Sequence, residues 1–313
     1  MIFQLLDDKT GCAGYYADGQ LVFDDLPPGA SGTWDYSPHL AAHPDVNFAR
    51  LYCGGMSLGE VCPDSEKENW LAVTTRLKAF LRSFSAAKVS LDEHCFFQLV
   101  PERFLLEFFD AKQNITSHVL ETYSKPSNYD FLVELSVVLA NISQRSLNLH
   151  SDSLKHMLGS KRARDFWKKT KTHRQIQYNL FGTKTGRLTT KKTSFPILTM
   201  DSNFRSVVNP HNDWLVELDF NAAELRVLLA LSGNEQPSED LHEWNMRNVF
   251  ERGLSRDEAK KNIFAWLYNP KALNTAAERV YNRALVLEKH FDGAQVETTY
   301  GRKIAADDHH ALN

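Results

Sequence analysis

Apolar residues recur at three- and four-residue intervals along several stretches of the chain, and this spacing predicts amphipathic helices. The pattern differs over residues 214–219. There the alternation of residues predicts a mainly apolar strand that ends at the carboxylate of Asp219. Capping residues precede two helices, Asn128 or an earlier serine in one and Ser255 in the other. The expected helices span 70–84, 128–148, 160–172, 222–232 and 254–267, and short strands are expected over 2–6 and 20–23. The pattern predicts a small mixed α/β region over 1–110, and the residue pattern changes from about residue 113.

The composition is typical of a soluble globular protein with one large domain or two ordinary ones. Of 313 residues, 42% are apolar and 24% are charged. No stretch reaches the roughly 18 uncharged apolar residues of a membrane helix, and Asp7 and Asp8 come too early for a secretory signal. The cysteines lie far apart without a Cys-x-x-Cys pair: Cys12, Cys53, Cys62 and Cys95. We therefore expect no zinc knuckle, disulfide scaffold or membrane partner, and a cytoplasmic location.

Charge is divided unevenly along the chain. Residues 1–150 hold 11 lysines and arginines against 19 acidic residues, a net charge of −8, whereas residues 151–313 hold 25 against 20, a net charge of +5. Eight of the basic residues fall within 151–175. This distribution favours a polyanion-binding surface in the second half, where two helices could bind nucleic-acid phosphates. The same charges also suit a solvated helix face.

The helix expected over 254–267 carries a stripe of four residues spaced four apart: Arg256, Lys260, Phe264 and Tyr268. At this spacing the side chains line one side of a helix. The first two are cationic and the last two aromatic, an order that suits a nucleoside triphosphate, with cations at the phosphates and aromatics at the sugar and base. The alternative is an ordinary amphipathic helix that buries its aromatic residues in the core.

Other short motifs flank this helix in a defined order. The Thr-Gly-Arg-Leu element at 185–188 and the Asp-x-x-x-x-Glu-Leu-Arg element at 219–226 precede it, followed by Asp240-Leu241-His242, and a Gly-Arg-Lys element at 301–303 comes after it. Together these motifs resemble the polymerase domain of family A DNA polymerases, the group of bacterial DNA polymerase I and related phage enzymes. The resemblance covers about residues 113–313, and its middle segment is most similar to the phage enzymes.

This resemblance implies an α+β right-hand polymerase fold, with a palm built around an antiparallel sheet. The implied parts are thumb helices over 113–180, a palm over 181–234, fingers over 235–293 and a return to the palm over 294–313. The resemblance does not explain the N-terminal α/β region over 1–112. We interpret the region over 1–112 as a degenerate or replaced exonuclease-like region with a structural or partner role. Its acidic pairs include no Asp-x-Glu pair on a convincing strand and are interpreted as surface charges: Asp7-Asp8, Asp24-Asp25 and Asp92-Glu93. We expect no proofreading from this chain.

The activity implied is template-directed DNA synthesis, in which a deoxynucleotide is transferred to a primer 3′-hydroxyl, in phage replication and thus the host cytoplasm. Asp219 matches the aspartate that binds both Mg²⁺ ions, with the backbone carbonyl of Phe220 as a further ligand, and two such ions promote in-line attack on a phosphate. Glu224 matches the gate that excludes a ribose 2′-hydroxyl. Arg226 is expected to brace the site.

The remaining motif residues match contacts to the nucleotide and to the DNA primer–template. Arg256 and Lys260 would hold the triphosphate, and Lys260 would also donate a proton to the leaving pyrophosphate. Phe264 would pack under the sugar, Tyr268 would guard the insertion pocket, and His242 would bind a phosphate oxygen unless it is a core histidine. Arg187 would reach the primer terminus. The further DNA contacts implied are Thr189, Thr190, Arg205 and Arg302.

The sequence departs from the family pattern in two places. Asn269-Pro270 follows Tyr268 where the family usually has glycine, so the helix is expected to end there. The second catalytic carboxylate, which the family carries in a His-Asp-Glu turn, has no counterpart, since Asp307, Asp308 and His309-His310 do not match it. We interpret the chain as the N-terminal part of a split or truncated polymerase, inactive without a C-terminal fragment that carries this turn.

Two other functions fit parts of the sequence. A catalytically inactive polymerase-like protein that binds primer–template would explain the missing carboxylate but not the triphosphate motifs. An unrelated metal-dependent nuclease would use Asp219 but would leave the Thr-Gly-Arg-Leu element and the stripe unexplained. Binding of a deoxynucleoside triphosphate distinguishes the polymerase from both.

Overall fold

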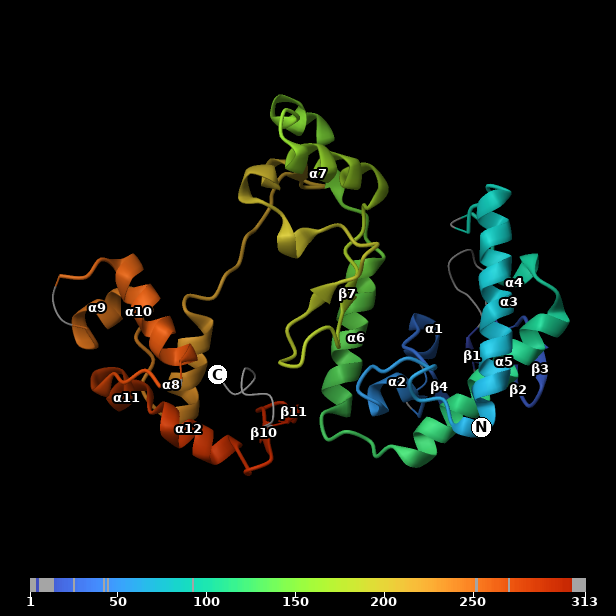
Figure 1. Cartoon of the computed structure of the whole chain (residues 1–313), viewed down its shortest axis with the longest axis horizontal. Helices are drawn as coiled ribbons and strands as arrows, with labels where there is room; N and C mark the ends of the chain where they lie inside the picture. The colour runs from blue at the N-terminus through green and yellow to red at the C-terminus, as the bar shows by residue number, and fades with distance from the viewer. Residues whose placement is uncertain are drawn as a thin grey trace. The chain divides into compact units, whose positions relative to one another are not determined.

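The computed structural model describes residues 4–5, 14–24, 26–41, 43, 45–91, 93–250, 253–269 and 271–305. The chain forms two compact units, and each is described by itself. The first unit consists of Met1–Leu147, Lys168–Gly182 and Leu188–Met200, and the second of Asn148–Trp167, Thr183–Arg187 and Asp201–Asn313. Figure 1 labels their helices and strands in chain order.

The first unit is built around two long helices, α3 (Lys67–Ala86) and α5 (Glu102–Thr122), which pack against each other. The apolar face of α5 is deeply buried and includes Phe104, Phe109 and Ile115. Tyr16 of a small antiparallel sheet stacks on Phe109, with ring centroids 6.0 Å apart. That sheet has the order β1 (Gln4–Leu5), β2 (Tyr15–Ala17) and β3 (Gln20–Val22).

Shorter elements complete the first unit. Helix α6 (Tyr129–Ser143) packs on α2 and places Tyr129 and Leu132 in a buried cluster. Strands β7 (Tyr178–Asn179) and β8 (Thr189–Thr190) form an antiparallel pair, and β4 (Gly32–Thr33) and β5 (Asn47–Phe48) a parallel one. The others are α1 (Pro38–Ala41), α2 (Ala49–Tyr52), α4 (Phe96–Leu99), and the 3₁₀ helices η1 (Asp64–Glu66) and η3 (Ile197–Thr199).

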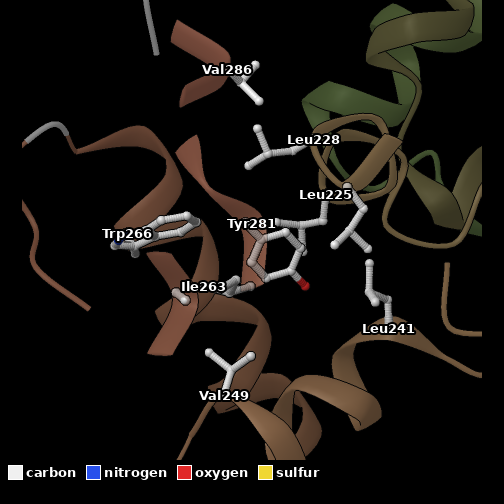
Figure 2. Close-up of a cluster of buried hydrophobic side chains, with 10 residues drawn as sticks. Leu225, Leu228, Leu241, Val249, Ile263, Trp266, Tyr281 and Val286 are labelled. Atoms are coloured by element: carbon white, nitrogen blue, oxygen red, sulfur yellow. The ribbon is translucent and has the colours of Figure 1, made fainter. Parts of the chain in front are cut away.

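Helices of the second unit share one apolar core (Figure 2). They are α8 (Ala223–Ser232), α9 (Leu241–Asn248), α10 (Arg256–Tyr268), α11 (Thr275–Tyr281) and α12 (Arg283–His290). Leu225, Ile263 and Tyr281 are fully buried at its centre. The unit also contains η2 (Ser151–Met157), η4 (Ser202–Val207), the β6–β9 pair (Asn148–Leu149 with Val208–Asn209) and the β10–β11 pair (Gln295–Glu297 with Lys303–Ala305). Helix α7 (Lys161–Thr172) contributes residues to both units.

The structure confirms a mixed α/β chain with small sheets, and each expected helix is present with shifted ends. The helix expected over 128–148 ends at Ser143, because the chain enters a β-bridge at Ser146 and then β6. The boundary expected at 112/113 falls inside α5. The division into thumb, palm and fingers stays a prediction. In the part of the chain that the structure describes, no helix is both long and apolar enough to cross a membrane.

The strand expected over 214–219 is wrong. Residues 213–220 have no regular secondary structure and are exposed throughout, with Trp214 at 80% and Leu218 at 90% exposure. A strand forms only where a neighbouring strand pairs its backbone N–H and C=O groups, and none of the described sheets includes this segment. The expected strand over 20–23 is confirmed as β3, and that over 2–6 is seen as β1 within the two residues described there.

Candidate functional site

Helix α10 carries the predicted stripe and also a face that packs into the core. A capping box fixes its start: the Ser255 hydroxyl accepts the Glu258 N–H, and the Glu258 carboxylate accepts the Ser255 N–H at 2.8 Å. The core face consists of Ala259, Ile263 and Trp266, all buried. Of the stripe residues, Arg256, Lys260 and Tyr268 are exposed, whereas Phe264 is half-buried and packs against the core cluster. Tyr268 therefore lies outside the buried face of the helix, and Phe264 lies partly within it.

The aromatic half of the stripe forms a stacked shelf. The rings of Phe264 and Tyr268 have centroids 5.8 Å apart and an interplanar angle of 14°, and the His242 ring lies 5.7 Å from Phe264. His242 is only 3% exposed, and its Nδ1 has no hydrogen-bond partner among the described residues. Burial lowers the pKa of His242, and the charges of Arg256 and Lys260 lower this pKa further against the opposing effect of Asp240. A neutral imidazole at this position fits a hydrogen-bonding role better than a cationic one.

Glu224, in the motif at 219–226, is hydrogen-bonded to residues of two other predicted motifs. It lies in the first turn of α8, after Ala222 adopts a left-handed conformation with φ 54°. Its Oε1 accepts hydrogen bonds from Arg187 Nη2 at 2.7 Å and from Tyr268 Oη at 2.9 Å. Burial, and then this carboxylate, raise the pKa of Tyr268, so the phenol stays a donor. Residues 37 and 44 positions apart from Glu224 thus converge on one oxygen.

Asp240 organises the cationic half of the site. As the N-cap of α9 it accepts the N–H groups of His242 and Glu243, both at 3.0 Å from Oδ1. It also binds Arg256 in a two-point contact, with Nε 3.2 Å from Oδ1 and Nη2 2.7 Å from Oδ2. The Arg256 guanidinium is the main reason that the pKa of Asp240 is far below its usual value. One carboxylate therefore caps one helix and fixes a side chain of the next.

Arg226 braces the turn that precedes α8, as expected. Its Nε donates to the Asn221 carbonyl at 2.8 Å, and its other nitrogens reach the carbonyls of Pro237 and Glu239, each at 2.9 Å. Every one of these acceptors is backbone within its own unit. The arrangement leaves Arg226 as a structural tie.

The structure does not bring every predicted residue into this group. Asp219 and Phe220 lie in the exposed segment, and Arg205 pairs with Glu217 at 3.5 Å. Arg302 donates to the carbonyls of Thr183 and Lys184, at 2.6 and 2.8 Å, and so ties the β10–β11 pair to the Thr-Gly-Arg-Leu loop. Gly186 in this loop has φ 87°, and a Cβ there would lie 3.1 Å from Arg302 Nη1. Thr189 and Thr190 form β8 of the first unit.

Asp219 and the backbone carbonyl of Phe220 are the predicted oxygen donors for magnesium. Among the described residues, no three His, Cys, Asp or Glu side chains gather into a group that could hold a metal ion. Asp219 and the Phe220 carbonyl are oxygen donors of the kind that Mg²⁺ prefers, but they do not by themselves make a site for two ions. The acidic pairs at Asp7-Asp8 and Asp307-Asp308, like His309-His310, Cys12 and Pro270, lie outside the described residues; so do Asp25 and Asp92.

A separate cavity of about 290 Å³ lies in the first unit. Its walls come from α6, from residues 177–181 and from the Asp35–Arg50 pair, whose closest atoms are 3.3 Å apart. None of the predicted site residues lines it.

Comparisons with known proteins found no match: no protein-family model, no curated protein and no solved structure is significantly similar to this chain. Two further residues belong to this site although the motifs predict no role for them, Asn221 and Asp240. The position of Asp240 before an apolar helical run is the signal of an N-cap. Nothing in the local pattern singles out Asn221, because its partners are up to 20 residues away.

Proposed function

We propose that this chain takes part in template-directed DNA synthesis as the N-terminal part of a family A-type polymerase with a right-hand fold. The observation that carries the proposal is the meeting of Arg187, Glu224 and Tyr268, which come from three separate motifs of the resemblance. An unrelated protein with chance motif matches has no reason to bring them to one carboxylate oxygen. The exposed cations of the stripe on α10, Arg256 and Lys260, add a second, independent feature of a triphosphate site.

In this proposal the residues of α10 bind the incoming deoxynucleotide. Arg256 and Lys260 hold the triphosphate, and Lys260 donates a proton to the pyrophosphate oxygen as it leaves. The stacked shelf of Phe264 and Tyr268 supports the sugar and base. Glu224, held by Arg187 and Tyr268, occupies the space that a ribose 2′-hydroxyl would need, and His242 offers a buried neutral nitrogen near the phosphates.

In this proposal the magnesium site would be completed by a second segment of the polymerase. When bound, two Mg²⁺ ions stabilise the charge that develops on the attacking and leaving oxygens. Asp219 and Phe220 supply only part of the ligands, so we assign the second carboxylate to a complementing segment with a His-Asp-Glu turn. The exposed apolar residues around Asp219 support this assignment, since Trp214, Leu218 and Phe220 are each at least 80% exposed and a large exposed apolar surface marks an interaction site.

The first experiment is primer extension with Mg²⁺ and four deoxynucleotides, comparing the wild-type chain alone with Asp219→Ala. We expect neither protein to extend the primer and the wild type to bind both primer–template and deoxynucleotide. Extension by the wild type, lost in Asp219→Ala, would show that this chain supplies the whole metal site and would refute the need for a second piece. Absence of deoxynucleotide binding would refute the polymerase proposal.

A catalytically inactive primer–template-binding protein is the second candidate. The lack of a counterpart to the second catalytic carboxylate in this sequence favours it. It has no need for a triphosphate site, so binding of primer–template without deoxynucleotide would support it over the polymerase.

A further inference from the structure

We propose that Asn221 is a positioning residue for the nucleotide site: through Asp240 it fixes the guanidinium of Arg256 for the triphosphate. The inference rests on the proposed function, and it concerns a residue with no contact of its own to the α10 stripe among the bonds described. Asn221 comes two residues after Asp219, so it also joins the segment with the first carboxylate to the helix that binds phosphate.

The side chain of Asn221 takes part in three hydrogen bonds. Its Nδ2 donates to Asp240 Oδ2 at 2.6 Å, and its Oδ1 accepts the Leu241 N–H at 2.9 Å and Arg226 Nη2 at 3.3 Å. An amide has four hydrogen-bonding positions, two donors and two acceptor sites, and three are used here. So many bonds restrict the side chain to one orientation.

Asp240 transmits that orientation to Arg256. Its Oδ2 is shared by Asn221 Nδ2 and Arg256 Nη2, at 2.6 and 2.7 Å. Its Oδ1 is shared by the α9 cap and Arg256 Nε, at 3.2 Å. Two-point contacts of a planar guanidinium with a carboxylate fix direction as well as distance. Removing Asn221 therefore frees the carboxylate on one side and lets Arg256 sample other directions.

The alternative is that Asn221 only stabilises the fold. Both explanations predict weaker nucleotide binding when Asn221 is changed, but they differ in what happens when Arg256 or Lys260 is absent. A positioning role acts through Arg256 and should disappear with it. Lys260 makes no described hydrogen bond to Asp240, so loss of Lys260 should leave the Asn221 effect intact.

The test measures the affinity of the full chain for magnesium–dATP by isothermal titration calorimetry, in a double-mutant cycle. We expect Asn221→Leu, which keeps the shape of the side chain but loses its hydrogen bonds, to weaken binding about tenfold, the factor of about one net hydrogen bond. In the Arg256→Ala background it should weaken binding less than twofold. In the Lys260→Ala background the tenfold loss should return.

Asn234→Leu is the matched control. Asn234 also makes a tertiary amide bond in the second unit, from Nδ2 to the Val280 carbonyl at 2.6 Å, and its described bonds do not reach Asp240 or Arg256. We expect it to lower the melting temperature as Asn221→Leu does while binding dATP like the wild type. Loss of binding in this control equal to that in Asn221→Leu would assign the effect to stability and overturn the inference.

The outcomes separate this inference from the proposed function. Wild-type binding that Arg256→Ala weakens and Asn221→Leu does not would overturn the inference alone. Equal losses from Asn221→Leu in all backgrounds would do the same. No dATP binding by the wild type would overturn the proposed function and the inference with it.

Discussion

The buried pair of Tyr281 and Asn245 offers a quantitative test of the core beneath the site. Both residues are fully buried, and the Tyr281 hydroxyl donates to Asn245 Oδ1 at 2.7 Å. Asn245 Nδ2 has no partner among the described residues. Burial raises the pKa of Tyr281 to about 12, so the hydroxyl remains protonated and donates over the whole working range of pH.

Tyr281→Phe keeps the aromatic ring and removes the only donor described for Asn245 Oδ1. The amide would then be buried with neither of its ends paired, and each unsatisfied polar group costs about 1–3 kcal/mol. We therefore expect the free energy of unfolding to fall by about 1–3 kcal/mol. In the double variant Tyr281→Phe/Asn245→Leu both partners are apolar, and replacement of both can be nearly neutral. The double variant should lose at least about 1 kcal/mol less than the sum of the two single variants.

Urea unfolding measures these differences, followed by circular dichroism and by tryptophan fluorescence. Trp266 reports on the same core, because it is 3% exposed and its ring centroid lies 6.0 Å from that of Tyr281. Leu273→Ala, at a side chain 96% exposed, is the control and should change stability by less than about 0.5 kcal/mol. The reasoning is refuted if Tyr281→Phe matches this control, or if the two core changes are additive.

Three further predictions concern the site. Because burial lowers the pKa of His242, its contribution to stability is present above the ordinary value of about 6.5 and is lost as the pH falls through the lower folded-state pKa. Urea unfolding at several pH values should therefore show a smaller loss of stability on acidification for His242→Gln than for the wild type, and equal losses would contradict this prediction. Glu224→Ala should bind ATP and dATP within about threefold of each other, while the wild type prefers dATP by more than about tenfold; an unchanged preference in competition binding contradicts the gate. Asp219→Asn should weaken Mn²⁺ binding in the presence of dATP, measured from the free-ion paramagnetic resonance signal, and equal binding would remove Asp219 from the metal ligands.

Local patterns predicted the helices well, because each helix closes its own hydrogen bonds and needs only an apolar stripe and a cap. Ser255 and Glu258 show this at α10, where the expected cap is present as a full capping box. The strand over 214–219 could not be judged in the same way. Its apolar residues are compatible with a strand, but a strand depends on a partner that lies elsewhere in sequence, and the described residues supply none.

The candidate site likewise has features that the sequence predicts and features that depend on the tertiary structure. Helical spacing places the four stripe residues on one side of α10, so the sequence by itself determined that they share that side. Whether that side is buried was left open, and the structure shows Tyr268 exposed and Phe264 packed partly on the core. Only the tertiary structure decided that Arg187 and Tyr268 meet at Glu224, and that Asn221 and Arg256 meet at Asp240. These contacts join residues 16 to 44 positions apart, and the packing of α8, α9 and α10 on one core sets their distances. Spacing along one helix is a property of the backbone, whereas the meeting of different elements depends on how their buried faces fit together.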